Sequence, residues 1–336
     1  MTEARTEVLP STLANFRGSP LYHRLLAFSG LIVLFLGFSI ASPNFYQTAN
    51  VINILQATSV NGVLAVAATL VIISGGIDLS VGTLMTFCSV MAGVFMTYWG
   101  LPMWIGVPGA LLVGLASGSV SGFFIAKLKI PPFIATLGMM LIYKGVSLAI
   151  CGAKPIYFTG VEGFTKISTG SVIGAIIPAL PIPNGVVVLF AVAGIAAFIL
   201  TRTALGRFTF AMGSNEEALR LSGVNIDAWK IAIYALAGAI CGVAGILIAS
   251  RINSAQPSIG QGYELDAIAA VVIGGTSLAG GRGTMLGTMI GALIISVVAN
   301  GLRILSVPQE WQIVVTGSII IIAVYGDILR GRARKA

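Results

Sequence analysis

Residues 230–250, KIAIYALAGAICGVAGILIAS, carry a charge only at their first position. About 20 apolar residues span the hydrocarbon core of a bilayer, where the backbone has to satisfy its own hydrogen bonds. This stretch therefore predicts a transmembrane helix. Similar stretches predict further spans at residues 25–41, 55–73, 80–98, 103–126, 133–151, 186–201, 264–279, 284–300 and 311–327. The expected fold class is an all-α membrane protein, a polytopic bundle of about ten transmembrane helices.

The composition of the chain supports this class. Only 9% of its 336 residues are charged, whereas about a quarter of the residues in a soluble domain are charged. The net charge of +8 comes from cations scattered between apolar runs, and these form no basic face for nucleic acid. The single histidine, His23, lies at the predicted inner interface, which excludes a histidine-based catalytic or metal site within the membrane. Cys88, Cys151 and Cys241 lie in apolar segments without metal-ligand spacing, so we expect small buried side chains.

The distribution of lysine and arginine predicts the orientation of the chain. These residues favour the cytoplasmic side of a membrane. With the N-terminus inside, most of them fall on the inner side, whereas Lys154, Lys166 and Arg303 fall outside. Both termini are then cytoplasmic. We expect one membrane domain over residues 1–336, with a cytoplasmic tail at 1–24, a cytoplasmic loop at 202–229 and a basic cytoplasmic tail at 328–336. The run at 25–41 is expected to stay as the first helix, in preference to a cleaved signal peptide.

Glycine recurs at a spacing of four in three of the predicted spans, where it lets neighbouring helices approach closely. Close packing inside one bundle is the favoured interpretation, and a dimer face is the alternative. The residues are Gly114, Gly118, Gly122, Gly238, Gly242, Gly283, Gly287 and Gly291. Separately, residues 75–82 resemble residues 274–281 at four positions. Paired broken helices in two halves point to a transport site, and chance similarity of glycine-rich segments is the alternative.

Polar residues in or beside the spans are candidates for a solute path, because charged groups at membrane depth are unfavourable and by default mark a functional site. Capping or anchoring of a helix end is the alternative, above all for Asp78, which precedes a new apolar run. The candidates for the path are Asn61, Asp78, Ser80, Glu264, Asp266 and Asn300.

The segment 203–224 predicts a short charged helix on the cytoplasmic side. Ser214 or Asn215 can cap its N-terminus, and Glu216 and Glu217 then lie in its first turn, where acidic residues are favourable. Gly223 supplies a C-terminal stop. On these features alone, a solvated connector is an equal alternative.

This segment resembles the coupling motif of the permeases of ATP-binding-cassette (ABC) importers, in which Glu-Ala-Ala is followed by glycine. Here Glu217-Ala218-Leu219 precedes Gly223, so the third position departs from the motif. Longer blocks resemble the ribose/galactoside/xylose-type branch of these permeases, and they cover most of the chain in order. They are residues 206–224, 76–82, 132–138 and 263–275.

The resemblance implies a permease of the cell inner membrane that imports a monosaccharide, either a pentose or a hexose. It implies a second permease copy as partner (in a homodimer or with a close paralogue), an ABC ATPase subunit that binds ATP and Mg²⁺, and a periplasmic sugar-binding protein. It implies no cofactor on this chain and no enzyme activity of its own. The coupling residues it implies are Gly206, Arg207, Gly213, Asn215, Glu216, Glu217, Ala218 and Gly223. The alternative is a secondary transporter or channel that uses Asp78, Glu264 and Asp266.

Overall fold

The computed structural model describes the backbone of residues 20–333 and the side chains of residues 28–326. The described part is almost entirely helical, as the sequence predicts. Its helices are α2 (Pro20–Ala41), α3 (Thr48–Ile73), α4 (Val81–Gly93), α5 (Met103–Ala126), α6 (Pro132–Cys151), α7 (Val172–Ile176), α8 (Asn184–Arg202), α9 (Ala204–Leu221), α10 (Ile226–Ile252), α11 (Tyr263–Ile273), α12 (Met285–Ile304) and α13 (Gln309–Ala333). A π-helical turn, Val94–Tyr98, extends α4, and a 3-10 turn covers Phe164–Ile167.

Eight helices of the described part are long and apolar enough to cross a membrane: α3, α4 with its π-helical extension, α5, α6, α8, α10, α12 and α13. The chain is therefore a polytopic membrane protein. In α2, which contains the first predicted span, the apolar part within the searched residues is Phe28–Ala41, shorter than this criterion requires.

The predicted span at 264–279 is wrong. Helix α11 contains 11 residues, so it is about 16 Å long, roughly half of a hydrocarbon core. It ends because Gly275 adopts a left-handed conformation (φ 87°), which terminates α-helices. The apolar residues that follow belong to a loop that reaches α12.

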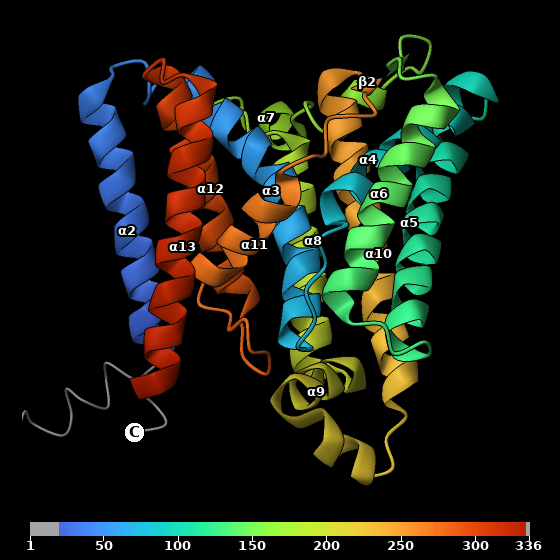
Figure 1. Ribbon diagram of the computed structural model, residues 1–336. Coiled ribbons are helices and arrows are strands. Elements are labelled where there is room, and N and C mark those ends of the chain that lie inside the picture. Colours follow the sequence, from blue (N-terminus) through green and yellow to red (C-terminus); the bar gives the residue numbers. More distant parts are fainter. Residues whose placement is uncertain (1–19, 334–336) are drawn as a thin grey trace, which may run out of the picture.

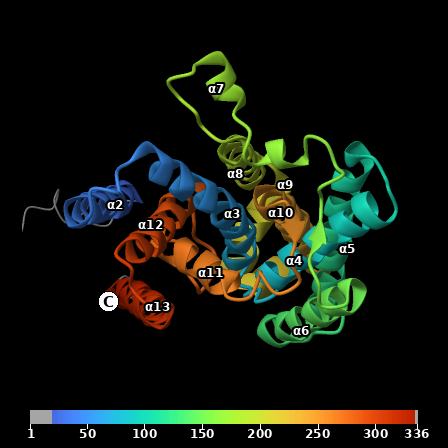
Figure 2. The same cartoon turned by 90° about the horizontal axis from the view of Figure 1, so that it is seen from above.

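Helices α3 and α10 form the centre of the bundle (Figures 1 and 2). On one side of α3 lie α11, α12, α2 and α13, beside α10 lie α4 and α5, and α6 packs on α4 and α5 at the edge. In the apolar window of α3, 83% of the residues are buried, whereas none is buried in that of α13. Helix α13 therefore lies at the periphery. Helix α9 projects from one end of the bundle, and α7 and β2 lie at the other end (Figure 1).

The spaced glycines lie at helix contacts inside this bundle. Gly114 and Gly118 on α5 face Gly238 on α10, and a Cβ atom at any of the three would collide with the backbone of the opposite helix. Gly122 approaches α10, Gly242 approaches α5, Gly287 approaches Gly274 at the end of α11, and Gly291 approaches α11 itself. Gly283 lies in the loop before α12, against the side chains of Thr276 and Ile73. This placement favours packing within the chain over the alternative of a dimer face.

The long connection between α6 and α8 is partly ordered by a small antiparallel sheet. Strand β1 (Ile156–Tyr157) pairs with β2 (Ser254–Ala255), with Ile156 opposite Ala255. The rings of Phe158 and Phe164 pack beneath it with centroids 4.2 Å apart. The sheet ties this connection to the segment that follows α10.

Candidate translocation path and coupling helix

Helix α9 contains a break at Asn215, whose φ of −160° and ψ of 97° interrupt the helical backbone. The Asn215 side chain accepts a hydrogen bond from the backbone N–H of Ala218 (2.9 Å), which is the geometry of an N-cap. Gly223, with φ 80°, follows the last turn as a left-handed stop. The short charged helix predicted for this segment is present as the second half of α9.

Glu216 fixes this second half to α10. Its carboxylate lies 2.7 Å from the Lys230 ammonium and 3.1 Å from the Arg220 guanidinium. Partial burial raises the pKa of the Glu216 carboxyl, but the hydrogen bonds and charges of Lys230 and Arg220 outweigh burial and lower the pKa below its ordinary value. Glu216 is therefore ionised at neutral pH and holds the start of the short helix.

The outer face of the short helix is free of the bundle. Glu217 and Ala218 are exposed, and the Leu221 side chain is 85% exposed at the end of the molecule farthest from the spans. The first half of α9 packs more closely, because Gly206 lies against the end of α8 and Thr209 and Met212 are buried. The first half of α9 is thus packed against the bundle, and the second half exposes its outer face to solvent.

The two glycine-rich segments end their helices in the same way. The N–H of Gly76 bonds to Val71 O (3.0 Å), and the N–H of Thr276 bonds to Val271 O (3.1 Å). Gly75 and Gly275 have φ values of 85° and 87°. Both are the backbone pattern of a Schellman C-terminus. The local conformation at the end of α3 is thus repeated at the end of α11. Helix α3 is long enough to cross a membrane, whereas α11 is not, so only the second of these segments ends a short helix.

These segments meet each other and α9. The N–H of Gly281 donates to Ile73 O (2.8 Å), which joins the α11–α12 loop to the end of α3. Gly213, just before the break in α9, lies close to the end of α3 and to the α11–α12 loop. A Cβ atom at Gly213 would collide with Ile73 O and Gly281 N. A Cβ atom at Gly280 would lie 3.0 Å from the Cα atoms of Gly213 and Gly75. We call Gly75, Gly213, Gly280 and Gly281 the glycine junction.

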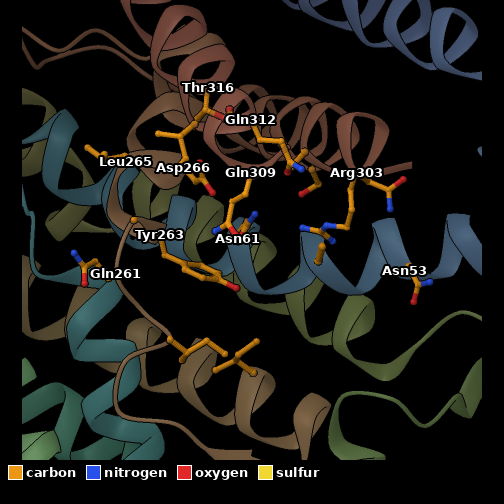
Figure 3. A pocket seen from close by; sticks show the side chains of 18 of the residues that line it. Asn53, Asn61, Gln261, Tyr263, Leu265, Asp266, Arg303, Gln309, Gln312 and Thr316 are labelled. Carbon is orange, nitrogen blue, oxygen red and sulfur yellow. Dashed lines mark hydrogen bonds between the residues drawn. The ribbon is translucent and has the colours of Figure 1, made fainter. Parts of the chain in front are cut away.

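A polar cavity of about 890 Å³ (Figure 3) is lined by helix ends that lie opposite α9 in the bundle (Figure 1). It is enclosed by the first half of α3, the last turns of α10 and α12, α11 and the first half of α13. Three of the predicted path residues line it, namely Asn61, Asp266 and Asn300. The other three, Asp78, Ser80 and Glu264, do not.

Asp78 and Glu264 bond to neighbouring residues of their own segments. Asp78 is 7% exposed and accepts hydrogen bonds from the backbone N–H (2.7 Å) and hydroxyl (2.6 Å) of Ser80. Glu264 is 8% exposed and accepts from the N–H of Gly262 at 3.1 and 3.2 Å. Both contacts fit the alternative of a local anchor beside a helix start.

Asn300 is engaged in a reciprocal amide pair. Its side chain and that of Asn50 each donate to the other at 2.9 Å, and Asn50 also donates to Phe45 O. The pair clamps α12 to α3 at the rim of the cavity.

Asn61 and Asp266 differ from these groups. Within the described part of the chain, neither side chain has a hydrogen bond or ion pair. The same holds for the hydroxyl of Tyr263 and the guanidinium groups of Arg251 and Arg303, which line the same cavity. Sequence reasoning missed these last three, although Tyr263 directly precedes Glu264. The sequence did contain one usable signal for the polar cavity. Spacings of 3 and 11 return to one side of a helix, so one face of α3 carries Asn50, Asn53 and Asn61.

Membrane-spanning helices around a polar cavity, with a charged helix presented at the far end, define the class of membrane transport subunits. The comparisons place the chain within that class. A family model described as "Branched-chain amino acid transport system / permease component" matches residues 50–324. The chain belongs to this family and is the permease component of a binding-protein-dependent ABC importer, a multi-pass protein of the inner membrane.

Curated relatives match over nearly the whole chain. The ribose import permease protein of Escherichia coli K12 is 44% identical over 299 residues, which is 88% of this chain and 91% of the relative. The ribose import permease protein of Haemophilus influenzae is 38% identical and covers 95% and 98%. The xylose transport system permease protein of Escherichia coli K12 is 34% identical and covers 89% and 90%. No solved structure matches the chain.

Proposed function

We propose that the chain forms the path by which a monosaccharide, delivered by a periplasmic binding protein, crosses the inner membrane. The relatives that cover most of the chain are named as ribose and xylose permeases, which supports a pentose or hexose as substrate. The observation that carries the proposal is the glycine junction, because it puts α9 in contact with the end of α3 and with the loop that follows α11. A force applied to α9 from the cytoplasm therefore reaches the elements that line the cavity.

The orientation in this proposal is N-in and C-in. Helix α9 and the C-terminal end of α13 lie at the same end of the bundle (Figure 1), so the cytoplasmic loop 202–229 and the basic tail 328–336 share one side. The described start of α2 lies near that side as well. The tail 1–24 belongs there too, although residues 1–19 and 334–336 lie outside the described residues. Helices α2 and α11 complete the set of about ten membrane segments, with α11 as a half-length one.

In the coupling step, the second half of α9 sits in a groove of the partner ATPase. The residues assigned to this step are Gly206, Arg207, Gly213, Asn215, Glu216, Glu217, Ala218 and Gly223. When two ATPases close on ATP and Mg²⁺, α9 shifts and the junction passes the shift to α3 and α11. The energetic requirement is that the ATPase contacts α9 differently in the two states of the permease.

The remaining partners follow from the same assignment. A second permease, identical or a close paralogue, completes the path, and the chain needs no cofactor or nucleic acid. Within the path, Asn61 and Asp266 face the solute, Asn300 clamps the rim, and Asp78, Ser80 and Glu264 hold the starts of α4 and α11.

Reconstitution in proteoliposomes tests the proposal. Uptake of labelled D-ribose or D-xylose is expected only when permease, ATPase, loaded binding protein and ATP are all present. Uptake by the permease alone, driven by a proton or cation gradient, would contradict it and favour a secondary transporter. If the complete system imports neither of these pentoses, D-glucose and D-galactose are tested next, and uptake of none of the four sugars would refute the substrate class.

A further inference from the structure

We infer that the permease itself binds the solute through a polar site in the polar cavity, made by Asn61, Tyr263, Asp266 and Ser296. The inference rests on the proposed function and deepens it, because it assigns part of the sugar selectivity to this chain. The site is separate from the coupling helix, which lies at the other end of the bundle.

The first argument is the state of the hydrogen-bonding groups. Buried polar groups in proteins are almost always paired, and the neighbours of this site follow that rule, as the Asn50–Asn300 pair shows. In contrast, the Ser296 hydroxyl is fully buried without a partner within the described residues. The side chains of Asn61 and Asp266 lack one as well. These unpaired groups all line one cavity. The half-buried side chains of Asn61 and Asp266 are accessible to a polar ligand, and the Ser296 hydroxyl reaches one after a small shift of the atoms that cover it.

The second argument is the chemistry of the groups. The Asn61 amide both donates and accepts, as does the Ser296 hydroxyl, and the Asp266 carboxylate accepts up to two hydrogen bonds from adjacent hydroxyls. Tyr263 adds an aromatic ring and a hydroxyl at the same cavity wall. Figure 3 shows Asn61, Tyr263 and Asp266 directed into the same space. A neutral compound with several hydroxyl groups satisfies this combination.

Charge argues against ionic solutes. A hard metal cation takes six or more oxygen ligands, usually including several carboxylates, and Asp266 is the one acidic side chain among the described residues that line the cavity. Arg251 and Arg303 oppose a free cation. They would attract an anion, but an anion that reached Asn61 and Tyr263 would lie beside the Asp266 carboxylate, which repels it. The mixed charges leave a neutral polyhydroxyl solute as the best match.

The third argument is position. Asn61 lies on α3, 12 residues before Ile73, and hence about 18 Å along the helix from the glycine junction. Tyr263 and Asp266 lie on α11, whose following loop contributes Gly280 and Gly281 to the same junction. Asn61 is therefore carried by a helix whose end α9 contacts, and Tyr263 and Asp266 by a helix whose following loop α9 contacts. A shift of the junction changes their separation and with it the affinity for the solute.

The test uses the complete transporter in proteoliposomes, with whichever of D-ribose and D-xylose the wild type imports. We expect Asp266→Asn to raise the KM for uptake by about tenfold and Asn61→Ala by about fivefold, the range for lost charged and neutral hydrogen bonds. ATPase stimulation by loaded binding protein should not change. Glu310→Gln and Gln56→Ala are the matched controls, because neither side chain lines the cavity, and they should behave as wild type.

Deoxy sugars separate a direct contact from a structural effect. For a wild-type transporter, each deoxy analogue that has lost a contacted hydroxyl should show a raised KM. In Asp266→Asn, at least one such analogue should show the same KM as the parent sugar, because both partners of one contact are then missing. If the KM is unchanged in both Asp266→Asn and Asn61→Ala, in a transporter that imports the sugar, the inference is overturned and the proposed function stands. If the wild type imports no pentose or hexose, the proposed function itself fails.

Discussion

Single residues at the cytoplasmic end carry distinct roles. Glu216 is paired with Lys230 and Arg220, whereas Glu217, one position later, is exposed. The first is suited to hold the short helix and the second to meet the ATPase. Asn215 and Gly223 set the two ends of that helix through a side-chain cap and a left-handed stop.

Replacing Glu217 or Gly223 by alanine should uncouple transport from ATP hydrolysis. Glu217→Ala removes a presented charge, and Gly223→Ala strains a left-handed position by about 1–2 kcal/mol. In both cases the amount of permease in the membrane should equal that of wild type, as measured by immunoblotting. Normal sugar uptake in both variants would remove the coupling role from this segment.

Glu216→Gln should loosen the short helix with a small effect on overall stability. The pair with Lys230 is partly solvated, and such pairs contribute at most about 1 kcal/mol. Because the pKa of Glu216 is lowered, its stabilising effect is complete above the ordinary pKa of glutamate and is lost as the pH falls through the lowered value. ATPase stimulation should therefore be reduced in Glu216→Gln by a factor that does not change between about pH 6 and 8. A pH profile of wild type against the variant that diverges within this range would contradict the assignment.

At the scale of elements, the amide pair between α3 and α12 is a structural clamp. Asn300→Ala leaves the Asn50 side chain without its partner on α12 and should lower the free energy of unfolding by about 1–3 kcal/mol. The double variant Asn50→Ala/Asn300→Ala should cost much less than the sum of the single ones. Thermal unfolding of the four proteins in one detergent checks this, and strict additivity would show that the pair does not act as a unit.

Elements with a long apolar run or a clear capping pattern could be predicted from the sequence. The spans on α3, α10 and α12 follow from hydropathy, and the break at Asn215 from its position before Glu216. The length of α11 could not be predicted, because Gly274 and Gly275 lie inside an apolar run. Average hydropathy does not detect a backbone turn. Only some of the residues that line the polar cavity could be predicted from the sequence. Arg251 and Tyr263 belong to it through the packing of α10 and α11 against α3, which one sequence does not reveal.

At the scale of the whole molecule, two sites at opposite ends are joined by rigid elements. Helix α9 is at the cytoplasmic end and the polar cavity is toward the other (Figure 1). Helix α3, and α11 together with the loop that follows it, extend from the cavity to the glycine junction, where the backbones of three segments touch. Such an arrangement can transmit a movement because close-packed elements shift as bodies and do not deform continuously.

The measurement that tests this account most directly is the number of sugar molecules imported per ATP hydrolysed by Gly213→Ala. A Cβ atom at Gly213 collides with the backbone at Ile73 and Gly281, whereas one at Gly138 on α6 meets nothing within 4 Å. The account predicts that Gly213→Ala still hydrolyses ATP but imports at least about tenfold less sugar per ATP, equivalent to about 1.4 kcal/mol of lost coupling. Gly138→Ala should match wild type. An unchanged ratio in Gly213→Ala, at a normal level in the membrane, would contradict the claim that α9 acts through the glycine junction.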